Sequence, residues 1–126
     1  MNNSIFYRVR CFVKNFFRGI KYRRQRARRG YSDRDLWDIG EYLSTIVPPM
    51  MRDLKDNGSG YPVKIGSRKK WEEILEDIAK GFEAQLKLKV NYSKRYNENG
   101  KELEELLKTK DKGLKLFIKY LGAFWS

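Results

Sequence analysis

Residues 67–90 read SRKKWEEILEDIAKGFEAQLKLKV, and this stretch decides the fold class. Its apolar residues recur three or four positions apart, which is the spacing of one face of an α-helix. Ser67 is a favoured residue at a helix N-terminus. The acids at 72, 73, 76 and 77 precede the lysines at 80, 87 and 89, an order that suits the helix dipole, whereas the cations at 68–70 in the first turn oppose it. The sequence therefore predicts a helix over 67–90 with a buried line of Trp71, Ile74, Leu75, Ile78, Phe82 and Leu86.

Two further segments show the same helical period. In residues 32–54, Ser32 and Asp35 have the spacing of a capping box, which predicts a helix that opens at Ser32. Its expected core line is Leu36, Gly40, Leu43, Val47, Met50 and Leu54, with Trp37 and Met51 beside it. Adjacent prolines are expected to kink or split this helix near residues 45–47, because proline lacks a backbone donor.

The last helix is expected over residues 101–124, after a polar loop at 91–100. A glycine-rich stretch makes residues 56–66 a turn and loop. Only residues 61–65 offer a candidate strand. The predicted fold is all-α: a small bundle of about four helices that includes a long basic N-terminal helix.

Composition excludes several functional classes. The chain has 126 residues, no histidine and a single cysteine, Cys11. It therefore has no histidine base, no intrachain disulfide and no cysteine-based zinc site. Asp33, Asp35, Asp38 and Glu41 form a compact cluster of carboxylates. Of these, Asp35 and Asp38 lie one turn apart, the spacing of a pair that could hold Mg²⁺, but acids at a helix start usually serve the helix end. We expect a protein that is not an enzyme, with no catalytic residues, no metal and no cofactor.

The positive charge is concentrated at the N-terminus. The net charge is +12, and residues 1–30 hold ten cations and no acid, so residues 31–126 are nearly neutral. Such asymmetry predicts an anionic partner, because like charges held close together repel each other. We therefore divide the chain into a basic arm, residues 1–30, and a bundle domain, residues 31–126.

The first part of the arm is amphipathic. Its apolar residues share an arc of about 140° on a helix of about 100° per residue, namely Ile5, Phe6, Val9, Phe12, Val13, Phe16, Phe17 and Ile20. Three explanations stay open for this face: packing on the bundle, insertion into an anionic membrane surface, or a seam between two copies.

The second part of the arm carries six cations in residues 21–29, which resembles arginine-rich helices that bind RNA. The predicted polyanion-binding residues of the arm are Arg18, Lys21, Arg23, Arg24, Arg26, Arg28 and Arg29. A second cationic corner surrounds the glycine-rich loop. Its predicted residues are Tyr61, Lys64, Arg68, Lys69 and Lys70, which suit a small phosphorylated ligand such as a nucleotide.

The motif RRGYSDRDLWD at residues 28–38 resembles a group of small proteins encoded by tailed bacteriophages. The similarity extends through Pro48-Pro49, Gly60-Tyr61-Pro62 and Gly81-Phe82 to the aromatic end at 117–125, and it leaves the arm outside. The resemblance implies a phage product that acts in the host bacterial cytoplasm or in the virion, and small phage accessory proteins usually bind or sequester a target.

Three functional hypotheses follow from these observations. The first is a polyanion-binding protein whose partner is nucleic acid or a nucleotide. The second is a counter-defence factor that holds a host defence protein or a cyclic nucleotide messenger. The third is a virion or membrane-surface component. Eighteen aromatic residues, with Phe124 and Trp125 at the end, also favour a homo-oligomer.

Overall fold

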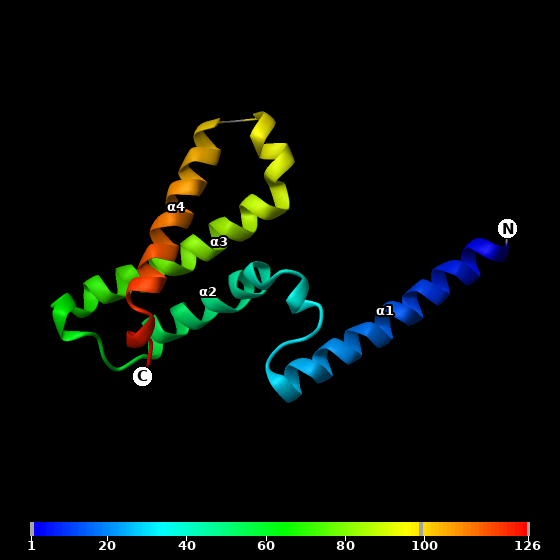
Figure 1. The fold of residues 1–126 in the computed structure, drawn as a ribbon, viewed down its shortest axis with the longest axis horizontal. Coiled ribbons are helices and arrows are strands. Elements are labelled where there is room, and N and C mark those ends of the chain that lie inside the picture. Colours follow the sequence, from blue (N-terminus) through cyan, green and yellow to red (C-terminus); the bar gives the residue numbers. More distant parts are fainter. Residues whose placement is uncertain (1, 99, 126) are drawn as a thin grey trace. The chain divides into compact units, whose positions relative to one another are not determined.

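The computed structural model describes residues 2–98 and 100–125, with side chains described for 3–89 and 100–125. Within these residues the chain is all-helical and contains no strand, which confirms the predicted fold class (Figure 1). The candidate strand at residues 61–65 contains a 3-10 turn, Val63–Ile65. The four α-helices are α1 (Asn2–Arg29), α2 (Ile39–Asn57), α3 (Arg68–Glu98) and α4 (Gly100–Lys119).

The chain divides into two compact units, Met1–Ile39 and Gly40–Ser126. The first unit contains α1 and the turn that follows it. The second contains α2, α3 and α4. The first unit thus extends past residue 30, where we expected the arm to end, because the following turn is bonded to α1, as described below.

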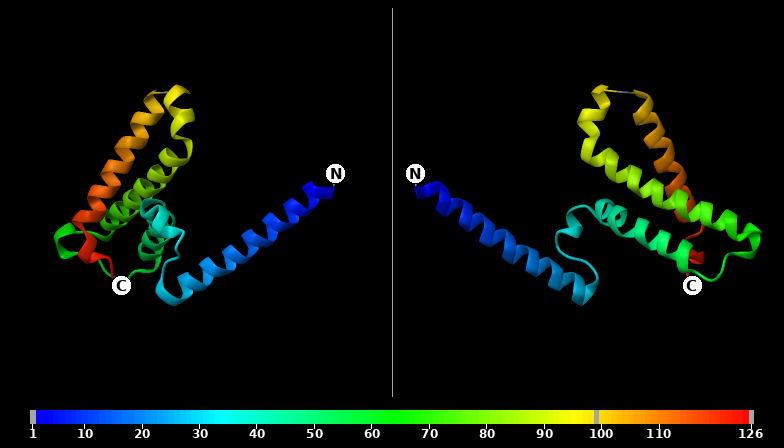
Figure 2. Two further views of the ribbon diagram at one scale, coloured as in Figure 1. Left: turned by 45° about the vertical axis from the view of Figure 1, so that its right-hand side comes forward. Right: turned by 180° about the vertical axis from the view of Figure 1, so that it is seen from behind.

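The second unit is an antiparallel bundle with α3 at its centre (Figure 2). The helices α2 and α3 run antiparallel. Glu41 at the start of α2 pairs with Lys89 in the later part of α3 at 2.7 Å, and Lys55 near the end of α2 pairs with Glu76 in the earlier part of α3 at 2.9 Å. The helices α3 and α4 cross where Gly81 meets Gly113: a Cβ atom on either glycine would lie 2.6 Å from the other's Cα. This contact requires glycine on both helices. We expected a close helix contact at Gly40 instead, but Gly40 is exposed.

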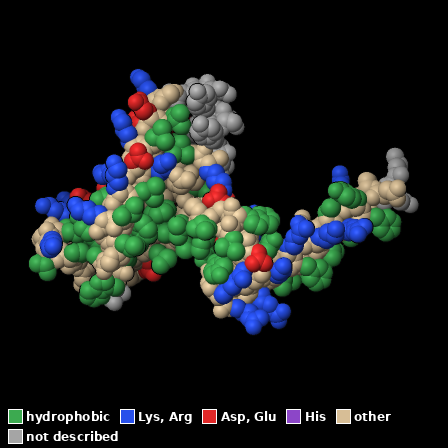
Figure 3. Space-filling view, in the orientation of Figure 1, with side chains coloured by type: hydrophobic (Ala, Val, Ile, Leu, Met, Phe, Trp, Pro, Cys, Tyr) green, Lys and Arg blue, Asp and Glu red, His purple; other side chains and the backbone are tan. Residues whose placement is uncertain are grey.

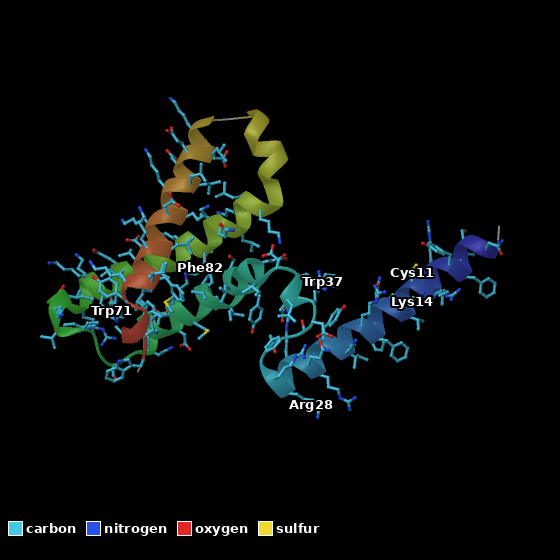
Figure 4. The ribbon with its side chains drawn as sticks, viewed as in Figure 1. Cys11, Lys14, Arg28, Trp37, Trp71 and Phe82 are labelled. Atoms are coloured by element: carbon cyan, nitrogen blue, oxygen red, sulfur yellow. The ribbon has the colours of Figure 1, made fainter. Side chains whose placement is uncertain are left out.

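The core confirms most of the line predicted on α3. The buried cluster consists of Val47, Met51, Trp71, Leu75, Ile78, Ala79 and Phe82. Figure 4 shows Trp71 and Phe82 on α3, within the bundle. Phe124 stacks between Trp71 at 5.8 Å and Phe117 at 5.6 Å, as measured between ring centroids. Phe124 is therefore part of the core, and of the two terminal aromatics only Trp125 is exposed.

Several helix boundaries differ from the sequence predictions, including the end of the last helix, which was expected at residue 124 and lies at Lys119. The helix expected from Ser32 begins at Ile39, because Asp38 is extended (φ −153°) and interrupts it. This break leaves Leu36 and Trp37 exposed outside α2, and Met50 is exposed on it, so the predicted core line is wrong at those positions. The polar loop expected at 91–100 is also wrong, since α3 continues to Glu98 and α4 starts at Gly100.

The prolines do not split α2. The helix runs unbroken through Pro48 and Pro49, although each proline removes one backbone donor. Val47, Pro48 and Met51 are all buried, and burial of this apolar surface offsets the lost hydrogen bonds. The missing backbone donors predicted a split in the helix, and the packing of its buried residues against the bundle keeps the helix continuous.

A charged network joins α2 to α3 and makes the stability of the bundle depend on pH. Arg52 donates to Glu76 at 3.2 Å and also pairs with Glu83. The hydrogen bonds from Arg52 and Lys55 lower the pKa of Glu76 from 4.5 to about 2. A carboxyl whose pKa is lowered on folding contributes stability above its unfolded pKa and loses it as the pH falls toward the folded value.

We therefore expect the free energy of unfolding to fall between pH 4.5 and about 2, partly through Glu76. Glu76→Gln should remove about 1 to 2 kcal/mol at neutral pH and flatten this acid limb. Urea unfolding at about pH 6 and about pH 3 measures both effects. Glu73→Gln is the matched control, because Glu73 is exposed and has no ion pair within the described residues. Equal acid sensitivity in the Glu76→Gln variant would contradict the assignment.

Candidate anion-binding interface

The helix α1 presents two different faces along a length of about 42 Å. Its apolar face consists of Ile5, Phe6, Val9, Phe12, Val13, Phe16, Phe17 and Ile20, whose exposed fractions run from 42% to 74%. Figure 3 shows Lys and Arg side chains in a row along α1, with hydrophobic side chains exposed beside them. The predicted amphipathic helix is therefore present, and nothing within the first unit covers its apolar face.

The polar face carries cations that lack acidic partners. Arg8, Arg10, Lys14 and Arg18 are exposed, and none has a carboxylate within ion-pair distance in the described part of the chain. Cys11 and Lys14 project from the same side of α1 (Figure 4). Because residues 1–30 contain no acid, this charge stays uncompensated along the first two thirds of the helix.

After α1 the chain turns back on itself. Gly30 adopts a left-handed conformation (φ +87°) and its amide donates to the Arg26 carbonyl at 2.9 Å, which ends the helix as the sequence predicts. The capping box also forms: the Ser32 amide donates to Asp35 at 2.8 Å and the Asp35 amide donates to Ser32 Oγ at 3.3 Å. It closes a 3-10 turn at Asp35–Trp37 instead of opening a long helix. We call residues 30–37 the hook.

The two acids of the hook hold arginines of α1. Arg26 donates to both oxygens of Asp35 through Nε, at 2.9 Å, and Nη2. This bidentate bond holds the pKa of Asp35 well below its usual value, and burial of Asp35 opposes the shift. Asp33 accepts from Arg29 and from Gln25, the latter at 2.8 Å, and these bonds lower the pKa of Asp33.

The hook therefore divides the predicted arm site into two groups. Lys21, Arg26 and Arg29 have carboxylate partners, with Lys21 at the longest distance, 3.9 Å from Asp33. These three predicted polyanion-binding residues are therefore held by the chain's own acids. Four predicted residues have no acidic partner among the described residues, namely Arg18, Arg23, Arg24 and Arg28.

The helical repeat places the unpaired arginines relative to the two faces. At about 100° per residue, Arg23 and Arg24 fall within the arc of the apolar face, and Arg28 falls at its border. Gln25 and Arg29 fall on the opposite side, and Arg26 falls beyond the other edge of the arc; the hook binds all three. One side of α1 is thus apolar over residues 5–20 and cationic over residues 23–28. Figure 4 shows Arg28 at the carboxyl end of α1.

The cationic corner of the bundle is smaller than predicted. Arg68 pairs with Glu72 at 3.1 Å and donates to the Gly58 carbonyl at 2.7 Å, so it serves to hold the loop against α3. Lys64, Lys69 and Lys70 are exposed and have no acidic partner within the described residues. Three predicted lysines therefore remain available at this corner.

Tyr61 lines a shallow pocket of about 310 Å³ together with Pro62 and Trp125. Sequence reasoning singled out Tyr61 and missed Trp125 as its neighbour, because nothing local connects residues so far apart in the chain. The phosphorylated ligand predicted at this corner stays a prediction.

The acids of the candidate magnesium cluster have partners within the chain. Asp35, one of the pair considered as magnesium ligands, binds the side chain of Arg26, and the neighbouring Asp33 binds that of Arg29. No group of three or more metal-binding side chains occurs among the described residues. Among those residues, no helix has the length and apolarity needed to cross a membrane. The arrangement is suited to binding through charge and apolar surface.

Comparison with known proteins adds no family to this description. No protein-family model, no curated protein and no solved structure matches the chain.

Proposed function

We propose that this chain is a non-enzymatic binding protein whose arm attaches to an anionic macromolecular surface. One observation carries the proposal: seven of the ten cations in residues 1–30 are exposed and have no carboxylate partner within the described residues. A row of unpaired arginines and lysines keeps a high positive potential, which an external anion relieves. Arginine also binds phosphate oxygens with two parallel hydrogen bonds.

The hook gives the arm a defined surface. Because Arg26 and Arg29 are bound by Asp35 and Asp33, the outward charge near the end of α1 comes from Arg23, Arg24 and Arg28. The hydrogen bonds of the hook also fix the last turns of the helix, so these three arginines project from an ordered element. An ordered cationic surface loses less side-chain and backbone freedom on binding than a disordered tail.

The proposal is tested by the salt dependence of binding. We expect the full chain to bind an anionic polymer or vesicle with an affinity that falls about a thousandfold or more between about 50 and about 200 mM salt. Replacing Arg23, Arg24 and Arg28 with glutamine should weaken binding at low salt by at least about tenfold and reduce the salt slope. Fluorescence anisotropy measures the nucleic acid, and vesicle sedimentation measures the lipid.

The control variant replaces Lys80, Lys108 and Lys115 with glutamine. These bundle lysines are exposed, have no acidic partner among the described residues, and change the net charge by the same amount. An affinity that does not move with salt would defeat the proposal. Equal losses in the two triple variants would assign the effect to net charge and not to the arm.

The remaining expectations stay predictions. These are phage origin, location in the host cytoplasm or virion, a host defence protein or nucleotide as target, and assembly into a homo-oligomer.

A further inference from the structure

We propose that the anionic surface bound by the arm is a lipid bilayer, and that α1 lies in its interface with the apolar face inserted. This inference rests on the proposed function and names its partner. It starts from the apolar face of α1, whose eight side chains are all exposed. Binding to a polyanion through charge alone needs no apolar surface. The apolar face therefore favours a bilayer, which has an acyl region, over other polyanions.

The charges border the apolar face on both sides. At about 100° per residue, Arg8 lies beyond one edge of the arc and Arg10 beyond the other, with Lys14 and Arg18 on the opposite side. All four are exposed and lack an acidic partner within the described residues. On a bilayer, long cationic side chains at these positions reach the phosphate groups while the phenylalanines enter the acyl region.

Nucleic acid fits this face less well. Duplexes and single strands offer phosphates to the cations, but a continuous arc of eight apolar side chains has no counterpart on them. Aromatic contacts with nucleic acids are made by single stacked rings or by isolated wedges between bases. Nucleic acid would leave most of the apolar face in water, whereas a bilayer covers all of it.

A second copy of α1 is also disfavoured as the occupant. Pairing two apolar faces would bring the bordering cations of both helices together, and residues 1–30 contain no acid to separate or neutralise them. Like charges along a helix seam oppose association. Anionic lipid supplies the missing negative charge, so charge complementarity selects the membrane surface.

The apolar face of α1 is followed by arginines at the carboxyl end of the helix. On the side that carries the phenylalanines, residues 23 and 24 are arginines, and Arg28 lies at the border of that arc. These residues cannot enter the acyl region. We therefore expect insertion to stop near Ile20 and the following arginines to remain at the level of the headgroups.

The single cysteine provides a direct test on the full chain. Cys11 lies on the polar face, and Phe16 lies on the apolar face about 140° away. An environment-sensitive fluorophore is attached either to Cys11 or to the cysteine of a Cys11→Ser/Phe16→Cys variant. With vesicles of phosphatidylglycerol and phosphatidylcholine, the label at 16 should shift to the blue and be quenched by acyl-chain spin labels. The label at 11 should show neither effect.

Binding assays separate this inference from the proposed function. Phe12→Ser/Phe16→Ser should lower affinity for the anionic vesicles about a hundredfold and leave affinity for a DNA duplex unchanged. Salt-dependent DNA binding without vesicle binding would overturn the membrane inference and leave the proposed function standing. Binding to neither overturns both. Insertion is overturned if the serine variant binds vesicles as tightly as the parent chain. It is also overturned if the emission of the label at position 16 is already shifted to the blue without vesicles.

Discussion

Gly113→Val is expected to lower the free energy of unfolding of the bundle by about 3 kcal/mol and its melting temperature by about 12 to 24 °C. A Cβ atom at this position would lie 2.6 Å from the Gly81 Cα and 2.7 Å from the Asp77 carbonyl oxygen. Both atoms belong to the backbone of α3, so no side-chain rotation relieves the contact. The helices must separate, and separation loosens the packing of Leu75, Ile78 and Phe82.

Gly19→Ala is the control for this prediction. Gly19 lies within α1, and no atom comes within 4 Å of its added Cβ, so alanine there gains helix propensity without a clash. Circular dichroism melting of both variants compares them. If Gly113→Val melts within about 2 °C of the parent chain, the close crossing is absent, because overpacking of two backbones costs more than that.

The core of α3 could be predicted because its information is local. Large apolar residues repeat at helical spacing from Trp71 to Phe82, and this pattern alone places them on one buried face. The partner of Gly81 could not be predicted in the same way. A glycine signals that something approaches closely, but the sequence does not say that the approaching residue is Gly113 on α4.

The hook shows the same limit at the candidate site. Asp33 and Asp35 were assigned to the start of a helix, and the capping box that justified this assignment does form. The outcome changes because Gly30 reverses the chain. Asp35 returns to Arg26, nine positions earlier, and Asp33 returns to Gln25 and Arg29, eight and four positions earlier. The useful signal was a terminating glycine between an arginine-rich helix and two acids. This pattern of a glycine followed by two acids indicates that acids of the same chain neutralise some of the preceding cations.

This neutralisation leads to the second large effect: Asp33→Asn combined with Asp35→Asn should strengthen binding of the arm to anionic vesicles by about ten- to a hundredfold at low salt. The substitutions remove two negative charges and release Lys21, Arg26 and Arg29. The hook should loosen at the same time, because the uncharged amides lose the ion pairs with Arg26 and Arg29 that hold it to α1. Faster amide hydrogen exchange at residues 31–37 measures that loosening.

A matched variant distinguishes release of the three cations from a change in net charge. Asp111→Asn combined with Glu104→Gln removes the same two charges from exposed positions on α4 that have no ion pair among the described residues. If the two double variants bind equally tightly, net charge explains the gain and the acids of the hook have no specific role. If only the hook variant gains affinity, the acids of the hook limit binding in the parent chain. Because the pKa of Asp35 is held below its usual value, this limit applies at neutral pH and weakens only as strong acid protonates the carboxyl.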